Sequence, residues 1–310
     1  MIFIMFYFKE IKSENQEIKL PIFKNNNIRV FIKREDLIHS IISGNKFRKL
    51  KYNVEKALNE KKDQIITFGG AFSNHILATA YIGKLTNLKT IGIIRGDELL
   101  NKKLNSTLQN CKNFGMKFLF ISRTDYKKRN NAEYINTLRK KYTNSFIIPE
   151  GGTNYLGVKG CEEILEKDDD FFDVICCPVG SGGTIAGLIN SKKKFQKILG
   201  FSALKSSNIN NVITKFVNNN DWKIFDDNFF KGYSKIDNRL VNFINDINKQ
   251  TGILLDPIYN SKMLYHIIKM ISNDQWIYGK KILLINTGGL QSINEINFKL
   301  KKKGCEIINH

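Results

Sequence analysis

Lys46 has the surroundings from which a reactive amine can be built. It follows Gly44-Asn45 and opens a stretch of helical character, residues 46–50. A helix N-terminus and neighbouring cations such as Lys49 disfavour the charged ammonium, so they lower the pKa of the amine toward neutrality. A neutral amine can form a Schiff base with a carbonyl compound. Taken alone, however, the segment fits a solvated lysine at a helix start better.

A second segment, residues 68–75, joins an apolar run to a helix-forming stretch through Gly69-Gly70. Backbone N–H groups in such a turn can bind a carboxylate, and the Ser73 hydroxyl and the Asn74 amide add directional donors. The competing interpretation is that Ser73 only caps the helix, which is a common role for serine.

A third segment, residues 178–184, has the sequence Pro-Val-Gly-Ser-Gly-Gly-Thr between an apolar run and a helical stretch. Backbone donors in a turn of this kind form a cradle for a phosphate. The pattern is neither a P-loop nor GxGxxG, so it does not favour a nucleoside triphosphate or a dinucleotide. A tight turn without any ligand is the alternative.

The C-terminal half adds two tyrosines and a further turn. Tyr233 follows Lys231-Gly232, Tyr259 and Asn260 lie in the stretch 256–262, and residues 286–289 read Asn-Thr-Gly-Gly. These side chains can line a pocket, although each tyrosine taken singly is more often a core or boundary residue.

The elements that must position these residues alternate along the chain. Short β-branched runs predict strands at residues 64–68, 90–94, 116–121, 145–148, 173–178, 198–203 and 281–286. Amphipathic stretches predict helices at residues 74–85, 99–114, 126–142, 157–166, 184–193, 208–219, 239–251, 261–272 and 290–302. Such alternation is typical of parallel sheets with right-handed crossovers, an α/β fold in which ligands bind at the carboxyl ends of strands. The candidate residues lie just after those strands.

The formal net charge of +20 raises the question of a nucleic-acid or membrane partner. The lysines are spread along the chain, and the densest basic runs are only three residues long, at 127–129, 192–194 and 301–303. Solvated helix surfaces explain such runs. We therefore expect no nucleic-acid partner, and a hydrophobic content of 42% predicts an ordinary globular core.

The five cysteines, Cys111, Cys161, Cys176, Cys177 and Cys305, show no CxxC spacing. They predict small core residues in a reducing compartment without a disulfide framework. The apolar residues 1–8 are too few to span a bilayer and lack a basic segment or a cleavage site, so they predict a first strand. The four histidines lack metal-ligand spacing. Together these features predict a cytoplasmic protein without a membrane partner or a catalytic metal.

In their order along residues 30–295, the motifs GNKxRKL, GG–SNH, VGSGGT, DPxY and TGG resemble one family. It is the pyridoxal phosphate (PLP)-dependent family of D-cysteine desulfhydrases and 1-aminocyclopropane-1-carboxylate deaminases. The resemblance implies two three-layer αβα domains with mainly parallel sheets, and PLP in the cleft between them. A larger PLP-binding domain would comprise residues 1–48 and 158–310, and a smaller inserted domain residues 49–157. A homodimer is also implied.

The resemblance further implies a role for each matching residue. Lys46 would form the Schiff base with PLP and Lys49 would help to hold the phosphate. The other cofactor-binding residues would be Asn74 at the pyridine 3′-oxygen, Asn260 at the pyridine nitrogen, Thr287 and Gly288 at the ring edge, and Gly180, Ser181, Gly182, Gly183 and Thr184 at the phosphate.

The substrate side of the site follows from the same resemblance. Ser73 would hold the substrate carboxylate, with Asn74 and His75 beside it. Tyr259 matches a catalytic tyrosine of the family, and Tyr233 matches a second tyrosine of the pocket. Each assignment is carried by the motif match and not by the spacing of these residues.

Two positions depart from the family pattern. Phe72 stands where the family usually has glutamine, and Asn260 stands where the deaminases carry glutamate and the desulfhydrases threonine. A carboxylate would keep the pyridine nitrogen protonated, which an amide cannot do fully. We therefore expect conversion of a small amino acid, D-cysteine first, to pyruvate, ammonia and hydrogen sulfide. The alternatives are 1-aminocyclopropane-1-carboxylate deamination and, less favoured, a non-catalytic PLP-binding or nucleic-acid-binding protein.

Overall fold

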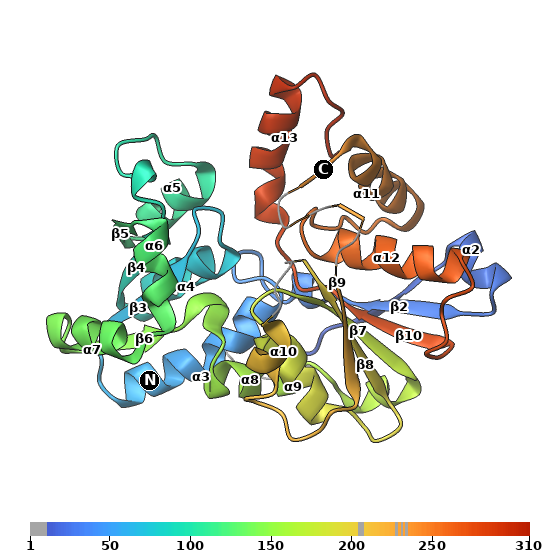
Figure 1. Ribbon diagram of the computed structural model, residues 1–310, viewed down its shortest axis with the longest axis horizontal. Helices are drawn as coiled ribbons and strands as arrows, with labels where there is room; N and C mark the ends of the chain where they lie inside the picture. The colour runs from blue at the N-terminus through green and yellow to red at the C-terminus, as the bar shows by residue number, and fades with distance from the viewer. Residues whose placement is uncertain (1–10, 204–207, 227–228, 231, 233–234) are drawn as a thin grey trace. The chain divides into compact units, whose positions relative to one another are not determined.

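The computed structural model of the protein describes residues 11–203, 208–226, 229–230, 232 and 235–310. These residues form two compact units (Figure 1). The described part of the first unit comprises Ile11, His39–Ile42 and Lys46–Gly160. The second comprises Lys12–Ile38, Ser43–Asn45 and Cys161–His310, apart from the undescribed positions. Among the described residues, the helices are all too short or too polar to cross a membrane.

The first unit is built on a four-stranded parallel sheet with the order β5-β4-β3-β6. Its strands are β3 (Gln64–Gly69), β4 (Lys89–Arg95), β5 (Lys117–Ile121) and β6 (Ser145–Ile148). Its helices are α3 (Asn45–Asn59), α4 (Asn74–Thr86), α5 (Ser106–Asn113), α6 (Arg123–Tyr126), α7 (Ala132–Lys141) and α8 (Tyr155–Glu162). Three short 3₁₀ helices join them: η2 (Asp97–Leu99), η3 (Lys127–Asn130) and η4 (Glu150–Gly152).

Helices cover both faces of this sheet. Successive side chains of a strand point to opposite faces. Ile94 of β4 accordingly packs with Ile76 of α4 and Leu108 of α5. Its neighbour Ile93 packs instead with Tyr126 of α6 and with α7. The unit therefore has three layers, with the sheet buried between two helical layers.

The second unit is built on a six-stranded sheet with the order β1-β2-β10-β7-β8-β9, in which β1 pairs with β2 in antiparallel fashion and the other neighbours are parallel. Its strands are β1 (Asn15–Ile18), β2 (Arg29–Lys33), β7 (Val174–Val179), β8 (Lys197–Ser202), β9 (Trp222–Asp226) and β10 (Lys281–Ile285). Its helices are α2 (Pro21–Asn25), α9 (Gly183–Ser191), α10 (Ile209–Ile213), α11 (Asn238–Thr251), α12 (Asn260–Ser272) and α13 (Ile293–Lys302), with 3₁₀ helices η1 (Glu35–Leu37), η5 (Lys167–Phe171) and η6 (Leu290–Ser292).

This sheet is also covered on both faces. Cys176 of β7 lies in one core cluster with Met263 and Ile267 of α12. On the opposite face, a side chain at Gly200 of β8 would meet Ile185 of α9 at 2.6 Å. The fold class that the sequence predicts, two three-layer α/β domains with mainly parallel sheets, is therefore confirmed.

Each predicted strand from residue 64 onward recurs within one or two residues. Three predicted helices begin later than predicted, and the predicted helices 157–166 and 208–219 end earlier, at Glu162 and Ile213. In the predicted helix 99–114, Asn105 accepts a hydrogen bond from the Leu108 N–H, so α5 starts only after it. In the predicted helix 126–142, Asn131 caps α7 in the same way. An asparagine side chain that satisfies free N–H groups at a helix start is a strong boundary signal, which hydrophobic periodicity misses.

The remaining expectations concern the N-terminal residues, the strands that were not predicted, and the cysteines. The predicted first strand, residues 1–8, lies outside the described residues. Strands β1, β2 and β9 were not predicted, and in β9 Lys223 interrupts the apolar run at the edge of the sheet. The cysteines are free thiols, and all are buried except Cys305, which is partly exposed.

Candidate functional site

In the second unit, the loop before α3 packs against the turn that follows β10. Gly44 has a φ of +64°, and a Cβ built on it would lie 2.1 Å from the Thr287 carbonyl oxygen. A Cβ on Gly288 would likewise lie 2.7 Å from Ser43 Oγ. Only glycine permits both the left-handed backbone and this close approach. The sequence therefore fixes residues 43–45 directly beside Thr287 and Gly288.

The same loop is tied to the turn that follows β7. Asn45 Nδ2 donates a hydrogen bond of 2.8 Å to Thr184 Oγ1, and both side chains are buried. Helix α9 begins at Gly183, and its N-cap, Gly182, has a φ of +86° and supplies no side-chain cap. A helix start with backbone donors alone is the arrangement that binds a phosphate.

The start of α12 adjoins this turn and also the turn after β10. Tyr259 lies against Gly180, since a Cβ on that glycine would stand 3.1 Å from the tyrosine Oη. The next residue, Asn260, accepts a hydrogen bond of 3.1 Å from the Thr287 N–H through Oδ1. Its Nδ2 donates to Gly288 O at 3.3 Å. Residues from four separate stretches of sequence thus meet at the carboxyl ends of β7 and β10.

Asp256 anchors this start of α12, a role that the sequence analysis did not assign. Its carboxylate accepts hydrogen bonds from the N–H groups of Ile258, Tyr259 and Asn260 at 2.8–3.0 Å, and from Asn260 Nδ2 at 2.5 Å. Burial raises the pKa of Asp256, and these hydrogen bonds act in the opposite direction. The dipeptide Asp256-Pro257 is typical of a turn in which the aspartate side chain binds backbone N–H groups further along the chain, and it was the signal that would have predicted this role.

In the first unit, Lys46 and Lys49 lie in the first two turns of α3. Lys49 Nζ donates to Gly151 O at 3.1 Å and to Thr153 Oγ1 at 3.2 Å. The loop after β6 therefore engages two of the three donors of the lysine that the resemblance assigns to the phosphate.

The start of α4 carries the other predicted residues of this unit. Ser73 Oγ accepts a hydrogen bond from the Ile76 N–H at 3.3 Å, so Ser73 does cap the helix. Asn74 is the first residue of α4 and His75 the second. The Ser73 cap satisfies only one of the backbone N–H groups at the start of α4. The capping role is therefore compatible with the predicted role in binding a carboxylate.

His75 is neutral and has a defined tautomer. Thr67 Oγ1 donates to Ile148 O at 2.9 Å, so its 2.7 Å contact with His75 Nε2 requires a proton on that nitrogen. Burial lowers the pKa of His75 well below its usual value, and the charges of Lys46 and Lys49 lower it further. A side chain on Gly152 would come within 3.5 Å of both Lys49 and His75. These contacts bring Lys46, Lys49 and His75 together.

The predicted residues thus form two groups, one in each unit. Lys46, Lys49, Ser73, Asn74 and His75 belong to the first unit. The second unit holds the turn 180–184, Tyr259, Asn260, Thr287 and Gly288. Tyr233 lies outside the described residues.

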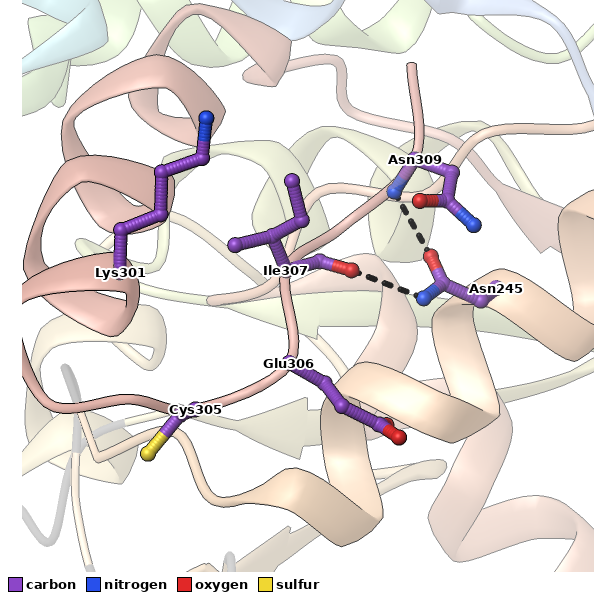
Figure 2. Close-up of a pocket in the computed structure, with 6 residues that line it drawn as sticks. All are labelled: Asn245, Lys301, Cys305, Glu306, Ile307 and Asn309. Atoms are coloured by element: carbon purple, nitrogen blue, oxygen red, sulfur yellow. Dashed lines mark hydrogen bonds between the residues drawn. The ribbon is translucent and has the colours of Figure 1, made fainter.

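A pocket at the C-terminal end of the second unit does not contain these residues. Its volume is about 520 Å³, and it is lined by Asn245, Lys301, Cys305, Glu306, Ile307 and Asn309 (Figure 2). Asn245 donates to Ile307 O at 2.9 Å and accepts from the Asn309 N–H at 2.9 Å, the two dashed lines of Figure 2. The side-chain amide of Asn245 therefore holds the C-terminal residues 307–309 against α11. Because these contacts serve packing of the C-terminal segment, we assign the pocket a structural role.

Comparison with known proteins defines the family. A family model described as pyridoxal-phosphate dependent enzyme matches residues 15–288, most of the chain. The chain therefore belongs to the family of PLP-dependent enzymes, which confirms the predicted cofactor and the predicted resemblance.

Individual relatives are similar over most of their length. A putative 1-aminocyclopropane-1-carboxylate deaminase of Thermotoga maritima is 31% identical over 84% of this chain and 88% of its own. A bifunctional mitochondrial D-cysteine desulfhydrase/1-aminocyclopropane-1-carboxylate deaminase of Arabidopsis thaliana is 31% identical over 86% of this chain and 73% of its own. A crystal structure described as an ACC deaminase homologue superposes with a TM-score of 0.81 at 28% identity, covering 94% of both chains.

Proposed function

We propose that this enzyme uses PLP to cleave a small β-substituted amino acid, D-cysteine first, to pyruvate, ammonia and hydrogen sulfide. The observation that carries the proposal is the bond from Asn45 to Thr184. Asn45 and Lys46 are consecutive, so their Cα atoms are about 3.8 Å apart. Covalent structure and one buried hydrogen bond thus tie the candidate Schiff-base lysine to the candidate phosphate turn.

The residues present fit PLP at both of its ends. Helix α9 starts without a side-chain cap, at glycines that leave its backbone donors uncovered by any Cβ, as a phosphate requires. Lys46 would hold the cofactor covalently, and Asn260, Thr287 and Gly288 would line the ring on the side of the β10 turn. Asn74 would hydrogen-bond the ring oxygen. When bound, PLP supplies an electron sink for bond cleavage at the amino-acid α-carbon.

The chain's own residues would orient the substrate and move its protons. Ser73, Asn74 and the first N–H groups of α4 would hold the substrate carboxylate, with the neutral His75 behind them. Lys46 or Tyr259 would take the α-proton, and the Tyr259 hydroxyl, held against Gly180, would be fixed in place for that transfer. The substituent on the β-carbon would then leave with the electrons of its bond, and hydrolysis by water would release the product as pyruvate and ammonia.

Deamination of 1-aminocyclopropane-1-carboxylate is the second candidate. The names of the Thermotoga and Arabidopsis relatives favour it, and the Arabidopsis name combines both activities. Asn260 is the residue at which the two reactions are expected to diverge. An Asn260→Glu variant that gains deaminase activity would support control by ring electronics, and a PLP-loaded variant without any gain would place control in the pocket.

A homodimer in the cytoplasm completes the proposal. It rests on the resemblance to the family and on the cysteine composition. Chromatography of the purified protein with light scattering would give the oligomeric state directly.

Product analysis of the PLP-supplemented protein tests the activity. D-cysteine, L-cysteine, D-serine and the cyclopropane acid are supplied separately, and keto acid, ammonia and sulfide are measured. We expect pyruvate and sulfide from D-cysteine, and loss of both in Lys46→Ala. Lys56→Ala is the matched control, because Lys56 lies on the same helix but is half exposed and pairs with Glu60. Absence of keto acid with every substrate from PLP-loaded protein would refute the proposal.

A further inference from the structure

The side-chain amide of Asn260 has only one orientation that satisfies its neighbours. The Thr287 N–H can only donate, so the amide atom 3.1 Å from it is the oxygen. Gly288 O and the Asp256 carboxylate accept, so the atom that faces both is the nitrogen. Three partners from two different loops therefore fix the polarity of a group whose orientation is often ambiguous.

Asp256 is the strongest of these three partners. Its side chain is buried, and its two oxygens accept three backbone N–H groups as well as Asn260 Nδ2. Four donors converge on it, and these hydrogen bonds oppose the increase in pKa that burial of the carboxyl group causes. A flipped Asn260 would turn its oxygen toward this carboxylate and its nitrogen toward the Thr287 N–H, which creates two repulsive contacts at once.

Contacts within the second unit show which residues surround the side chain of Asn260. Asn260 touches Thr287 and Gly288, and Gly288 lies against Ser43. Lys46 follows three residues after Ser43. Asn260 therefore adjoins the short segment from which the cofactor-binding lysine projects.

From this arrangement, and resting on the proposed function, we infer that Asn260 presents its carbonyl oxygen to the ring nitrogen of PLP as a hydrogen-bond acceptor. Asp256 is the positioning residue that enforces this polarity. Both amide N–H groups are engaged, whereas the oxygen keeps a second lone pair. An acceptor and a nearby negative charge both favour a ring nitrogen that carries a proton. The pair Asp256–Asn260 would thus present an acceptor to the ring nitrogen, with a carboxylate next to that acceptor.

The ring-nitrogen resonance of ¹⁵N-labelled PLP, measured at neutral pH in the loaded enzyme, tests this inference. We expect the position of a protonated ring nitrogen in the wild-type protein. In Asp256→Asn we expect a shift to the position of an unprotonated nitrogen. The double variant Asp256→Asn with Asn260→Asp returns a carboxylate to the pair and should restore the wild-type resonance. Damage to packing alone does not predict such a restoration.

Two control variants should leave the resonance unchanged. Asp173→Asn alters a carboxylate that also accepts two backbone N–H groups, but before the start of β7, at the other end of the strand. Ser261→Ala removes a buried hydroxyl next to Asn260 that has no hydrogen-bond partner among the described residues.

The outcomes separate this inference from the proposed function. An unprotonated nitrogen in the wild-type protein, or a shift in Ser261→Ala but not in Asp256→Asn, would overturn the inference while PLP binding at Lys46 stands. Failure of the wild-type protein to bind PLP at all would overturn both.

Discussion

Replacing Gly44 by alanine should damage the protein far more than replacing a glycine of the same backbone conformation elsewhere. Gly44 has a φ of +64° and Gly252, at the end of α11, a φ of +69°. Both substitutions force a left-handed alanine, at about 1–2 kcal/mol, and both gain about 0.4–1 kcal/mol by restricting the unfolded chain. Only Gly44 adds a clash, because its Cβ would stand 2.1 Å from Thr287 O, whereas nothing lies within 4 Å at Gly252.

The clash sets the difference between the two variants. Thr287 O is a backbone atom, so relief requires movement of the loop itself, and overpacking of this kind costs about 1–3 kcal/mol. We expect Gly44→Ala to be about 1–3 kcal/mol less stable than Gly252→Ala, a gap of about 1 M in the urea midpoint. Gly44→Ala should also weaken PLP binding, because Asn45 and Lys46 move with the loop.

Urea unfolding followed by circular dichroism measures the first effect, and titration with PLP measures the second. Equal midpoints for the two variants would contradict the close approach of residues 43–45 to the β10 turn. If Gly44→Ala is destabilised but binds PLP as tightly as the wild-type protein, the close packing at Gly44 stands, and the loop that contains Gly44 does not contribute to PLP binding.

Three further predictions concern single groups. Thr184→Val removes the acceptor of Asn45 Nδ2, so it should lower the stability by about 1–3 kcal/mol in urea unfolding and weaken PLP binding in a titration. An unchanged affinity for PLP would show that this hydrogen bond does not contribute to cofactor binding. The lowered pKa of His75 means that the unfolded chain binds a proton below about pH 6.5 that the folded chain does not. The free energy of unfolding should therefore fall with decreasing pH by up to about 1.4 kcal/mol per pH unit. The variant His75→Gln still offers an N–H group to Thr67, and it should reduce this pH dependence when unfolding curves at pH 7.5 and 5.5 are compared. Burial makes the buried thiols unreactive, as the pKa of Cys111, raised to about 12, illustrates, whereas Cys305 is partly exposed. A thiol reagent should therefore modify Cys305 quickly in the folded protein, and Cys305→Ser should abolish that fast phase.

The sequence was most informative where one local pattern decides the structure. Runs such as Ile282–Ile285 are buried on both faces of a parallel sheet, and their continuous apolar composition marks them as strands. Helix starts were less predictable, since Asn105 and Asn131 end a loop by side-chain hydrogen bonds that leave the hydrophobic pattern unchanged.

The candidate site shows the same division. Ordered motifs in the sequence mark Lys46 and the turn 180–184 as candidates. The bond that couples them through Asn45 and Thr184 joins residues 139 positions apart, which no local pattern reveals. The polarity of Asn260 likewise depends on Asp256 and on a turn 27 residues further on.

Borohydride reduction followed by peptide mass mapping tests most directly whether Lys46 forms an imine with PLP, as proposed. Reduction makes an imine bond permanent, so the phosphopyridoxyl mass should appear on the peptide that contains Lys46, and the visible absorption band should disappear. In Lys46→Ala neither the band nor the modified peptide should form. A phosphopyridoxyl group on Lys49 or on another lysine, or a PLP-supplemented folded protein without any modified peptide, would contradict the assignment.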